Sequence, residues 1–461
     1  MGLEICAIGG FTKTEGNSVA VKVDDEVVLL DMGLSMFDYV KFTEDMEDTS
    51  TKTYSVLLKA NAVPDYGYIE DWKQKVVAIV PSHGHLDHVG AIPFAAPLFP
   101  PSAVVLGTPY TIEVLKSILW DEHLEIPHKF IVLNSGSSYK ISKNITIEFV
   151  HTTHSIPQTA IVVIHTPYGK VVYANDFKLD NTPVLGKKPD YERLQELGKE
   201  GVKLLIMNCL YAHEHKKCPS ETVAREMLKD TMLGFSGEDK AMIVTTFSSH
   251  LARLKSIMEL GKKLNRKVVF LGRSLDKYVR AGEKIGLVKF SDQVELLRHR
   301  DQLDKIFKKI RKEGKEKYLI VCTGHQGEPR SILTRMIKGD VDFTFEQGDV
   351  VIFSCQVIPV PVNIENRQKM EKLLRAQGVK LFRDVHVSGH GAREDHRELL
   401  EMIKPEHIMP IHAEPAKAKM IAELALQLGM KNTHVMKDGE RLTLSASVAS
   451  LQFTPLRKIT K

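Results

Sequence analysis

The N-terminal part of the chain is built from short apolar runs rich in β-branched residues, each ending in a polar or glycine-containing turn. Such runs predict strands. The run 160–165, the turn 166–169 and the run 170–176 follow one another directly, which predicts a hairpin and sheet-on-sheet packing rather than a purely parallel sheet. The predicted strands and their turns occupy residues 18–33, 75–85, 103–110, 145–155, 160–177 and 203–211.

From about Glu221 the pattern changes to an alternation of strand, helix and strand. This alternation indicates a parallel sheet with crossover helices, and therefore a second domain. Strands are predicted at 241–250, 266–272, 318–329 and 349–355, and helices at 251–265 and 275–286.

Residues of metal-binding type occur on both sides of this second domain, because histidine-containing motifs return at 385–391 and 409–415. The simplest interpretation is that the second domain is inserted within the first. We predict that the first domain occupies 1–207 and 381–461, and that the inserted domain occupies 208–380.

The composition agrees with more than one domain. The 461 residues are 43% hydrophobic and 26% charged, which allows a large core and exceeds the usual size of a single domain. The formal charge is only +5, from 63 basic and 58 acidic residues, so a surface for polyanions must come from local clustering. The polar segment 37–55 is predicted to be a surface loop.

The cellular location is predicted from cysteine usage and from the apolar segments. Five scattered cysteines, none in a Cys-x-x-Cys pair, argue against a disulfide framework and a cysteine zinc cluster. The first residues lack the basic and apolar regions of a signal peptide, and no apolar run approaches the roughly 20 residues that span a bilayer. We therefore expect a cytoplasmic protein that is not inserted in a membrane.

The segment Ser82–Gly90, SHGHLDHVG, holds three histidines and an aspartate between a predicted strand and a predicted helix. Residues two apart on an extended segment point the same way, so His83 and His85 can bind one metal while Asp87 and His88 turn toward a second. Nitrogen and carboxylate ligands suit zinc, and manganese is possible where oxygen ligands share the site.

Residues of matching type lie at other predicted strand ends. His154 and His412 each follow an apolar run, and Asp176 follows another, where one carboxylate could bridge two metals and a nucleophilic water. Asp31 also ends a strand, either to orient a ligand histidine or to form the turn before a glycine. Surface or packing roles are the favoured interpretation for His128, His151 and His165.

These motifs resemble a known family. HGHLDH is similar to the HxHxDH signature of the metallo-β-lactamase superfamily, and HSIP, NDFK, VSGH and PIHAE resemble the remaining motifs of ribonuclease J, a β-CASP nuclease, in order and spacing. TGHQGEP and VTTFSSH resemble further ribonuclease J segments. The resemblance covers nearly the whole chain and is strongest to the compact archaeal form, without the extra C-terminal domain of many bacterial relatives.

The resemblance implies an α/β fold, namely a metallo-β-lactamase αβ/βα sandwich with an inserted Rossmann-like β-CASP domain. It implies RNA hydrolysis with two Zn²⁺ per chain, or Mn²⁺ in their place. Two such metals, about 4 Å apart, can lower the pKa of a shared water and neutralise the charge that develops at phosphorus. The implied ligands are His83, His85 and His154 for one metal, Asp87, His88 and His412 for the other, and Asp176 for both.

Further residues are assigned by the resemblance around the scissile phosphate. His390 matches a histidine that acts as a general acid or steadies the phosphate, and Ser388 matches a phosphate contact. Asn208 stands where relatives carry an acidic residue that hydrogen-bonds this histidine and raises its pKa. Asn208 can accept a hydrogen bond through its carbonyl but supplies no charge, so we expect slow rather than absent catalysis. His386 is expected to point to the opposite face of its strand.

Two strand-end loops are candidates for binding a 5′-monophosphate. They contain hydroxyls, glycines and Arg330 close to predicted helix starts, where backbone N–H groups can bind phosphate. Ribonuclease J uses the equivalent loops in this way. The alternative is that they are ordinary strand-to-helix turns. The candidate substrate-binding residues are Ser248, Ser249, His250, Gly324, His325 and Gln326.

The first functional hypothesis is a processive 5′ to 3′ exoribonuclease that acts on single-stranded RNA and prefers 5′-monophosphate ends. The alternatives are an endoribonuclease that cuts internal sites and, because of Asn208, a weakly active RNA-binding protein. The basic cluster 308–317 either follows the RNA backbone or, in the interpretation we favour, forms a solvated helix face. The family suggests a homodimer, and the sequence identifies no RNA-decay partner.

Overall fold

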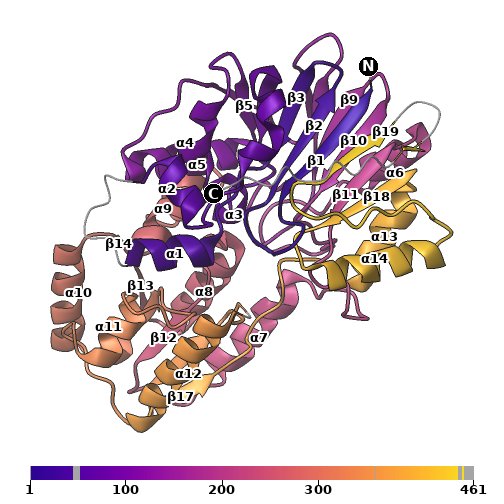
Figure 1. Cartoon of the computed structure of the whole chain (residues 1–461). Helices are drawn as coiled ribbons and strands as arrows, with labels where there is room; N and C mark the ends of the chain where they lie inside the picture. The colour runs from indigo at the N-terminus through magenta and orange to yellow at the C-terminus, as the bar shows by residue number, and fades with distance from the viewer. Residues whose placement is uncertain (1, 45–51, 359, 445–448, 451–461) are drawn as a thin grey trace.

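A computed structural model describes residues 2–44, 52–358, 360–444 and 449–450. Two of its three sheets lie face to face in the upper part of Figure 1. The first sheet has eight strands, in the order β20 (Ala449–Ser450), β19 (Arg441–Leu444), β1 (Leu3–Gly9), β2 (Ser18–Val23), β3 (Glu26–Leu30), β4 (Val76–Val80), β5 (Val104–Gly107) and β6 (Lys129–Val132). The second has six strands, in the order β18 (His407–Ile411), β11 (Leu204–Asn208), β10 (Gly169–Ala174), β9 (Ala160–Thr166), β8 (Thr146–His151) and β7 (Ser137–Lys140).

The third sheet is entirely parallel and lies in the lower part of Figure 1. Neighbouring parallel strands must be joined by crossover segments, as they are in a Rossmann-like domain. Its six strands have the order β14 (Glu295–Leu297), β13 (Lys267–Leu271), β15 (Tyr318–Cys322), β12 (Met242–Thr245), β16 (Val350–Phe353) and β17 (Lys380–Phe382).

Helices cover the outer faces of all three sheets. The first sheet is covered by α2 (Tyr54–Lys59), α3 (Leu86–Val89), α4 (Ile92–Ala95) and α5 (Pro109–Glu122). The second is covered by α6 (Tyr191–Glu200), α13 (Arg393–Ile403) and α14 (Pro415–Gln427). The third lies between α7 (Glu221–Leu233), α8 (Leu251–Lys263) and α9 (Arg273–Lys284) on one face and α10 (Arg300–Glu313), α11 (Ile332–Lys338) and α12 (Pro361–Ala376) on the other. None of the helices in the described ranges is both long and apolar enough to cross a bilayer.

Strand alternation produces this layering. In β2, Val19 and Val21 face the core between the two sheets, while Ala20 faces the helices on the other side. The result is the predicted α/β class with helix, sheet, sheet and helix layers, which is confirmed. The domain limits at 207 and 380 stay a prediction. The strand that precedes the third sheet in the sequence, β11, pairs in parallel with the strand that follows it, β18, and Asn208 lies opposite Ile411.

The predicted surface loop at 37–55 is wrong over two segments. Met36–Glu44 forms α1, and Tyr54–Lys59 forms α2. Tyr39 and Phe42 pack against the core around the first sheet, so an amphipathic helix is favoured although the segment is rich in charge. Residues 45–51 of the predicted loop lie outside the described residues.

A buried arginine lies where the inserted segment meets the sandwich. Arg253, on α8, is 0% exposed. Its guanidinium donates to both carboxylate oxygens of Glu221, at 2.6 and 2.8 Å, and to the carbonyl and hydroxyl of Ser354, at 2.9 and 2.8 Å. The backbone N–H of Glu221 in turn donates to Asp180, in the segment that follows β10. The arginine therefore stabilises the inserted segment directly beside its junction with the sandwich.

Replacing Arg253 by Ala leaves the Glu221 carboxylate buried without its main partner. We expect the free energy of unfolding to fall by about 3–5 kcal/mol, measured by urea denaturation followed by circular dichroism. The control is Arg311→Ala, because the Arg311 side chain is 72% exposed, and this change should cost less than about 0.5 kcal/mol. Equal unfolding midpoints for the two variants would contradict this account of the junction.

Candidate metal centre

The candidate ligands meet because their strands end at one edge. Strands β10, β11 and β18 run parallel, and β8 runs the same way because β9 is antiparallel to both β8 and β10. Their C-terminal ends deliver His154, Asp176 and His412, while the turn after β4 delivers His83 and His85 from the facing sheet. We call the resulting group the histidine cluster: His83, His85, Asp87, His88, His154, Asp176 and His412.

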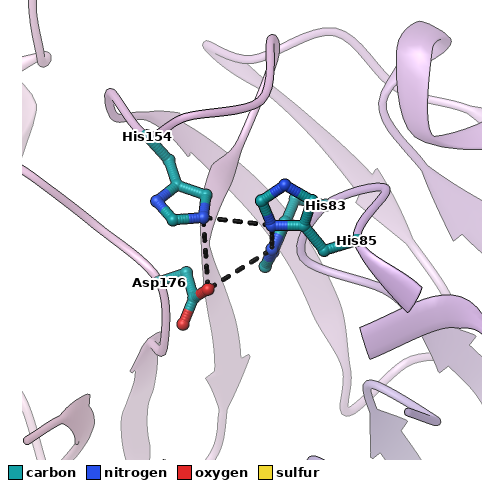
Figure 2. Close-up of side chains that lie close together, drawn as sticks. All are labelled: His83, His85, His154 and Asp176. Atoms are coloured by element: carbon teal, nitrogen blue, oxygen red, sulfur yellow. Dashed lines mark hydrogen bonds and ion pairs between the residues drawn. The ribbon is translucent and has the colours of Figure 1, made fainter. Parts of the chain in front are cut away.

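Asp176 lies in the middle of the histidine cluster and is only 3% exposed. Its Oδ2 atom lies 3.5 Å from His83 Nε2, 3.4 Å from His88 Nε2 and 3.2 Å from His154 Nε2. Figure 2 shows His83, His85 and His154 grouped around this carboxylate. His85 takes part through Nδ1, 3.1 Å from the Nε2 atoms of both neighbouring histidines. Four potential donor atoms therefore converge on one point.

A second group of donors adjoins the first. Asp87, His88 and His412 offer one ligand atom each within 4.8 Å of one another. The Nε2 atom of His88 lies 3.3 Å from Asp87 Oδ2, and that of His412 lies 3.7 Å from the other oxygen of Asp176, Oδ1. Asp176 thus contacts members of both groups: Oδ2 faces His83, His154 and His88, and Oδ1 faces His412.

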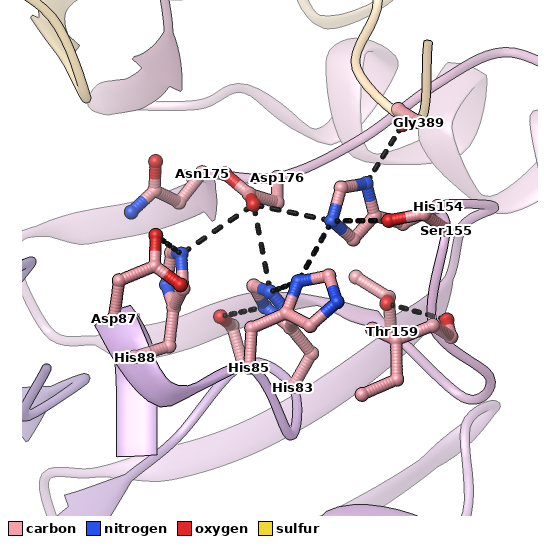
Figure 3. A network of polar contacts seen from close by, with 12 residues as sticks. His83, His85, Asp87, His88, His154, Ser155, Thr159, Asn175, Asp176 and Gly389 are labelled. Atoms are coloured by element: carbon pink, nitrogen blue, oxygen red, sulfur yellow. Dashed lines mark hydrogen bonds and ion pairs between the residues drawn. The ribbon is translucent and has the colours of Figure 1, made fainter. Parts of the chain in front are cut away.

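Oxygen atoms around the cluster fix the orientation of three imidazoles. The Nδ1 atom of His88 lies 2.7 Å from Asp31 Oδ2, and that of His154 lies 2.7 Å from the Gly389 carbonyl oxygen. The Nδ1 atom of His412 lies 3.0 Å from Asn17 Oδ1. An Nδ1–H donated to these acceptors leaves each Nε2 lone pair directed at the cluster, as Figure 3 shows for His88 and His154. This is the arrangement expected of metal ligands.

Asp31 therefore contacts the candidate ligand His88, which agrees with the first of the two roles considered for it, the orientation of a ligand histidine. It also accepts from the backbone N–H of Ser82 at 2.7 Å and from the hydroxyl of Tyr173 at 2.7 Å. Asn17 and Tyr173 were missed by sequence reasoning, because nothing in their local sequence marks them. The backbone is strained at two residues of the site, Asp31 and His412, because their φ angles are 56° and 69°.

Close backbone approach holds Asp87 in place. A Cβ atom on Gly33 would lie 1.7 Å from the carbonyl oxygen of Asp87, so only glycine fits there. The same carbonyl accepts from the backbone N–H of Asn17 at 3.1 Å. The aspartate–methionine–glycine turn after β3 therefore supports the second group of donors in two ways: Gly33 packs against the backbone of Asp87, and Asp31 contacts His88.

Burial and charge keep most of these imidazoles neutral. Burial lowers the pKa of His83 well below its ordinary value and that of His85 to about 3. Burial opposes ionisation of Asp176, but the neighbouring histidines, His412 first, hold its pKa well below the ordinary value. For His88 burial would lower the pKa, yet the carboxylates of Asp87, Asp176 and Asp31 raise it well above the ordinary value.

The donor set fits divalent cations. Neutral imidazoles and ionised carboxylates are the protonation states that bind zinc. The three carboxylates around His88 concentrate negative charge that a bound cation would balance. Among the described residues the groups of donors are His83, His85, His154 and Asp176; Asp87, His88 and His412; and Asp176, His390 and His412.

His390 adjoins the cluster, and its neighbour Asn208 is oriented differently from our expectation. The Asn208 carbonyl accepts from the backbone N–H of Leu210 at 2.8 Å. Its amide nitrogen donates to Asp176 Oδ1 at 3.0 Å and lies 3.3 Å from His390 Nδ1. The expectation that Asn208 offers its carbonyl to His390 is therefore wrong, because the amide nitrogen faces His390 and the carbonyl faces Leu210. Ser388 fixes the loop, since its hydroxyl accepts from the backbone N–H of His390 at 3.0 Å.

The candidate phosphate-binding residues are only partly brought to the cluster. The Ser249 hydroxyl lies 3.1 Å from His85 Nε2, and the Ser248 hydroxyl lies 3.1 Å from that of Ser274. His250 instead faces Glu221, at 3.3 Å. In the loop after β15, Gly324 has φ of 126°, His325 packs on Phe247, and both ends of the Gln326 side-chain amide bond the backbone of residues 356 and 358.

The other candidate histidines lie away from the cluster. His151 faces the Lys187 carbonyl at 2.9 Å, and His165 faces Glu148 at 2.7 Å. His128 is buried outside the cluster. His386 lies 3.3 Å from the Arg253 guanidinium rather than at the cluster. The expectation that it lies on a strand is wrong, because β17 ends at Phe382 and residue 386 follows it in a loop.

Comparisons with known proteins agree with this architecture. A family model described as "Ribonuclease J, beta-CASP domain" matches residues 239–373, and one described as "Zn-dependent metallo-hydrolase RNA specificity domain" matches residues 379–436. A crystal structure titled as a protein of unknown function from Enterococcus faecalis superposes with a TM-score of 0.65 at 17% identity, covering 96% of this chain and 100% of that one. That likeness concerns the fold alone.

Similar sequences cover almost the whole chain. Ribonuclease J of Methanocaldococcus jannaschii is 41% identical over 96% of this chain and 99% of its own length. Ribonuclease J of Pyrococcus abyssi is 42% identical over 97% of this chain and 98% of its own length. Ribonuclease J 1 of Streptococcus pyogenes is 31% identical over 97% of this chain and 75% of its own length.

Removing a ligand should remove bound metal. In His154→Ala the first group of donors loses one imidazole, so we expect the zinc content per chain to fall by about half, measured by mass spectrometry of the dialysed protein. The control is His151→Ala, three residues earlier at the end of β8, whose zinc content should match that of the unmodified chain. Equal zinc content in the two variants would contradict the assignment of His154.

Proposed function

This chain belongs to the ribonuclease J family, and from that membership we propose that it is a metal-dependent ribonuclease that degrades single-stranded RNA processively from the 5′ end. The observation that supports the chemistry is the convergence of histidine and aspartate donors on the two oxygens of Asp176. We further propose two zinc ions, or manganese in their place, with His83, His85 and His154 around one, Asp87, His88 and His412 around the other, and Asp176 between them. A cytoplasmic homodimer stays a prediction.

The residues of the chain bind and orient the substrate phosphate beside Asp176. When bound, divalent cations supply positive charge that polarises the scissile phosphate and acidifies the attacking water. Asp31, Asn17 and the Gly389 carbonyl keep three imidazoles in the required orientation, so little reorganisation is needed during the reaction. No serine or cysteine nucleophile is required.

The role proposed for His390 is to act on the leaving oxygen or on a phosphate oxygen. Its Nδ1 faces the Asn208 amide nitrogen, a donor, so the proton of a neutral ring belongs on Nε2. From Nε2 the ring can donate a hydrogen bond to substrate. A fully protonated ring would direct Nδ1–H at the amide N–H₂ group, so Asn208 disfavours the form that is the stronger acid. This supports slow catalysis.

The 5′-end preference rests on Ser248, Ser249, His250, Gly324, His325 and Gln326, of which Ser249 lies nearest the cluster. A hydroxyl beside His85 is suited to contact a terminal phosphate. The alternative of internal cleavage is kept because the same centre could act on any phosphodiester that reaches it. An RNA-binding role with little turnover is motivated by Asn208 alone.

The mode of cleavage can be tested on one RNA that carries a 5′-monophosphate, 5′-triphosphate or 5′-hydroxyl and is labelled at either terminus. With zinc or manganese we expect mononucleotides from the 5′ label, fastest from the monophosphate, resolved in a gel time course. His85→Ala should lose the activity, whereas His151→Ala should retain it. Internal fragments that are indifferent to the 5′ group would contradict the exonuclease proposal in favour of the endonuclease.

Restoring an acidic residue tests the role of position 208. In Asn208→Asp the carboxylate can accept Nδ1–H of His390 and favour its protonated form, so we expect the kcat for RNA hydrolysis to rise about tenfold or more. Asn208→Ala, which removes the side-chain contacts without adding charge, is the comparison and should not accelerate the reaction. An unchanged rate in Asn208→Asp would show that this position does not limit turnover.

A further inference from the structure

A groove on the inserted domain lies outside the histidine cluster. It has a volume of about 480 Å³ and is lined at the starts of α9, α10 and α11. We call it the arginine groove, because five of the eleven residues that line it are arginines. They are Arg273, Arg298, Arg300, Arg330 and Arg335.

The arginine groove lies at the carboxyl edge of the third sheet. Strands β14, β13 and β15 are parallel neighbours, and the residues directly after them, Arg298, Gly272 and Thr323, line the groove. The helix after β13, α9, covers one face of the sheet, whereas α10 and α11, which follow β14 and β15, cover the other. Open parallel sheets bind their ligands beyond the carboxyl ends of strands whose connections diverge in this way.

The arginine groove carries an excess of positive charge. Among the described residues its lining contains no carboxylate. Arg273, Arg300 and Arg335 have no ion-pair partner in the described part of the chain. Guanidinium groups bind phosphate oxygens through pairs of N–H donors, so several arginines around one groove are suited to a ligand with more than one phosphate.

Arg298 is fixed in the wall of the groove by a neighbouring helix. Its guanidinium lies 2.9 Å from Asp121 and 4.8 Å from the ring centroid of Trp120, both on α5. A planar guanidinium held on two sides loses little conformational freedom when it binds a ligand. Arg298 is therefore pre-organised.

Backbone N–H groups at the start of α9 add to the groove. This helix begins at Arg273, and its N-cap residue, Gly272, has no side chain with which to cap it. The first N–H groups of a helix lack acceptors within the helix and favour an anion. At the start of α10, in contrast, His299 and Gln302 already form a capping box. Phosphate oxygens in the groove can therefore accept from α9 as well as from the arginines.

The basic cluster at 308–317, which the sequence also offered, differs from the groove. Its side chains pair with carboxylates: Lys309 with Glu295 at 2.8 Å, and Arg311 with Asp342 at 2.8 Å. This supports the solvated-face interpretation of that cluster. The local excess of positive charge therefore lies in the arginine groove rather than where consecutive basic residues stand in the sequence.

Buried residues lie between the arginine groove and the histidine cluster. Ser274 lines the groove, and its hydroxyl lies 3.1 Å from that of Ser248. Ser249 in turn places its hydroxyl 3.1 Å from His85 Nε2. Ser248 and Ser249 are only 9% and 6% exposed. None of the six candidate residues for a 5′-monophosphate lines the groove, so the groove is a separate place on the molecule.

We propose that the arginine groove binds a free oligophosphate, either inorganic triphosphate or the triphosphate chain of a nucleotide. A chain of phosphates concentrates several negative charges in a short length, which matches arginines that come from three different loops. The volume lies in the range of pockets that bind small molecules, and Leu303 and Ile332 give the groove an apolar floor. The proposal does not depend on the proposed function.

Filter binding with radiolabelled ATP tests the proposal. We expect saturable binding of one ATP per chain, which inorganic triphosphate displaces and orthophosphate at the same ionic strength does not. If triphosphate competes as well as unlabelled ATP, the phosphates alone are recognised. If ATP competes better, the nucleoside also lies in the groove, and both results support the proposal. Equal competition by orthophosphate would contradict it.

Variants locate the bound ATP. Arg273→Ala and Arg300→Ala should each weaken ATP binding about tenfold, because each removes charge-assisted hydrogen bonds to phosphate. Arg311→Ala, on α10 like Arg300 but outside the groove, is the control and should bind ATP like the unmodified chain. An equal loss in Arg311→Ala would show general attraction to a basic surface, and the proposal would be wrong.

Two further arms exclude the catalytic centre and an RNA backbone. His85→Ala should bind ATP as tightly as the unmodified chain, and loss of binding there with retention in both groove variants would assign the ligand to the histidine cluster. In the same His85→Ala chain, a 5′-hydroxyl oligouridylate should compete less well than triphosphate at equal phosphate concentration. Better competition by the oligouridylate would make the groove an RNA surface and overturn the proposal, while hydrolysis of RNA by the unmodified chain would be unaffected.

Discussion

The structure depends on one buried carboxylate. Five imidazole nitrogens lie within 3.2 to 3.7 Å of the two oxygens of Asp176. Burial opposes the charge of this carboxylate, and the neighbouring histidines, His412 first, hold its pKa well below the ordinary value. An ionised carboxylate in such surroundings is costly unless it is paired or coordinates a cation. Each nearby histidine therefore has to be held in place, and the oxygen partners at Asp31, Asn17 and Gly389 do this. The geometry of the histidine cluster therefore depends on the geometry of the sheets, because nearly all of its residues lie just after strand ends.

The inserted domain is tied to the same place. The chain leaves the sandwich after Asn208, whose amide donates to Asp176, and returns through Gly389 and His390 to β18 and His412. Both connections thus carry residues that contact the cluster. The buried Arg253, bonded to Glu221 and Ser354, stabilises this junction from the side of the inserted domain.

The residues of the histidine cluster could be predicted because these candidate ligands sit in short motifs directly after apolar runs, so the periodicity that predicts a strand also locates its end. It could not find Asn17, which meets His412 across 395 positions of sequence, nor the orientation of the Asn208 amide, which the Leu210 N–H decides. The helix Met36–Glu44 was missed because a few apolar contacts outweigh a charged composition. Arg298 and Trp120 form one surface only after α5 meets α9, so no local pattern announces it.

The central claim is that Asp176 separates two cations, and the most direct test is an anomalous-difference map at the zinc absorption edge from crystals grown with zinc. The account predicts two peaks on opposite sides of the Asp176 carboxylate, one among His83, His85 and His154 and the other among Asp87, His88 and His412. A single peak, or peaks that avoid Asp176, would contradict it.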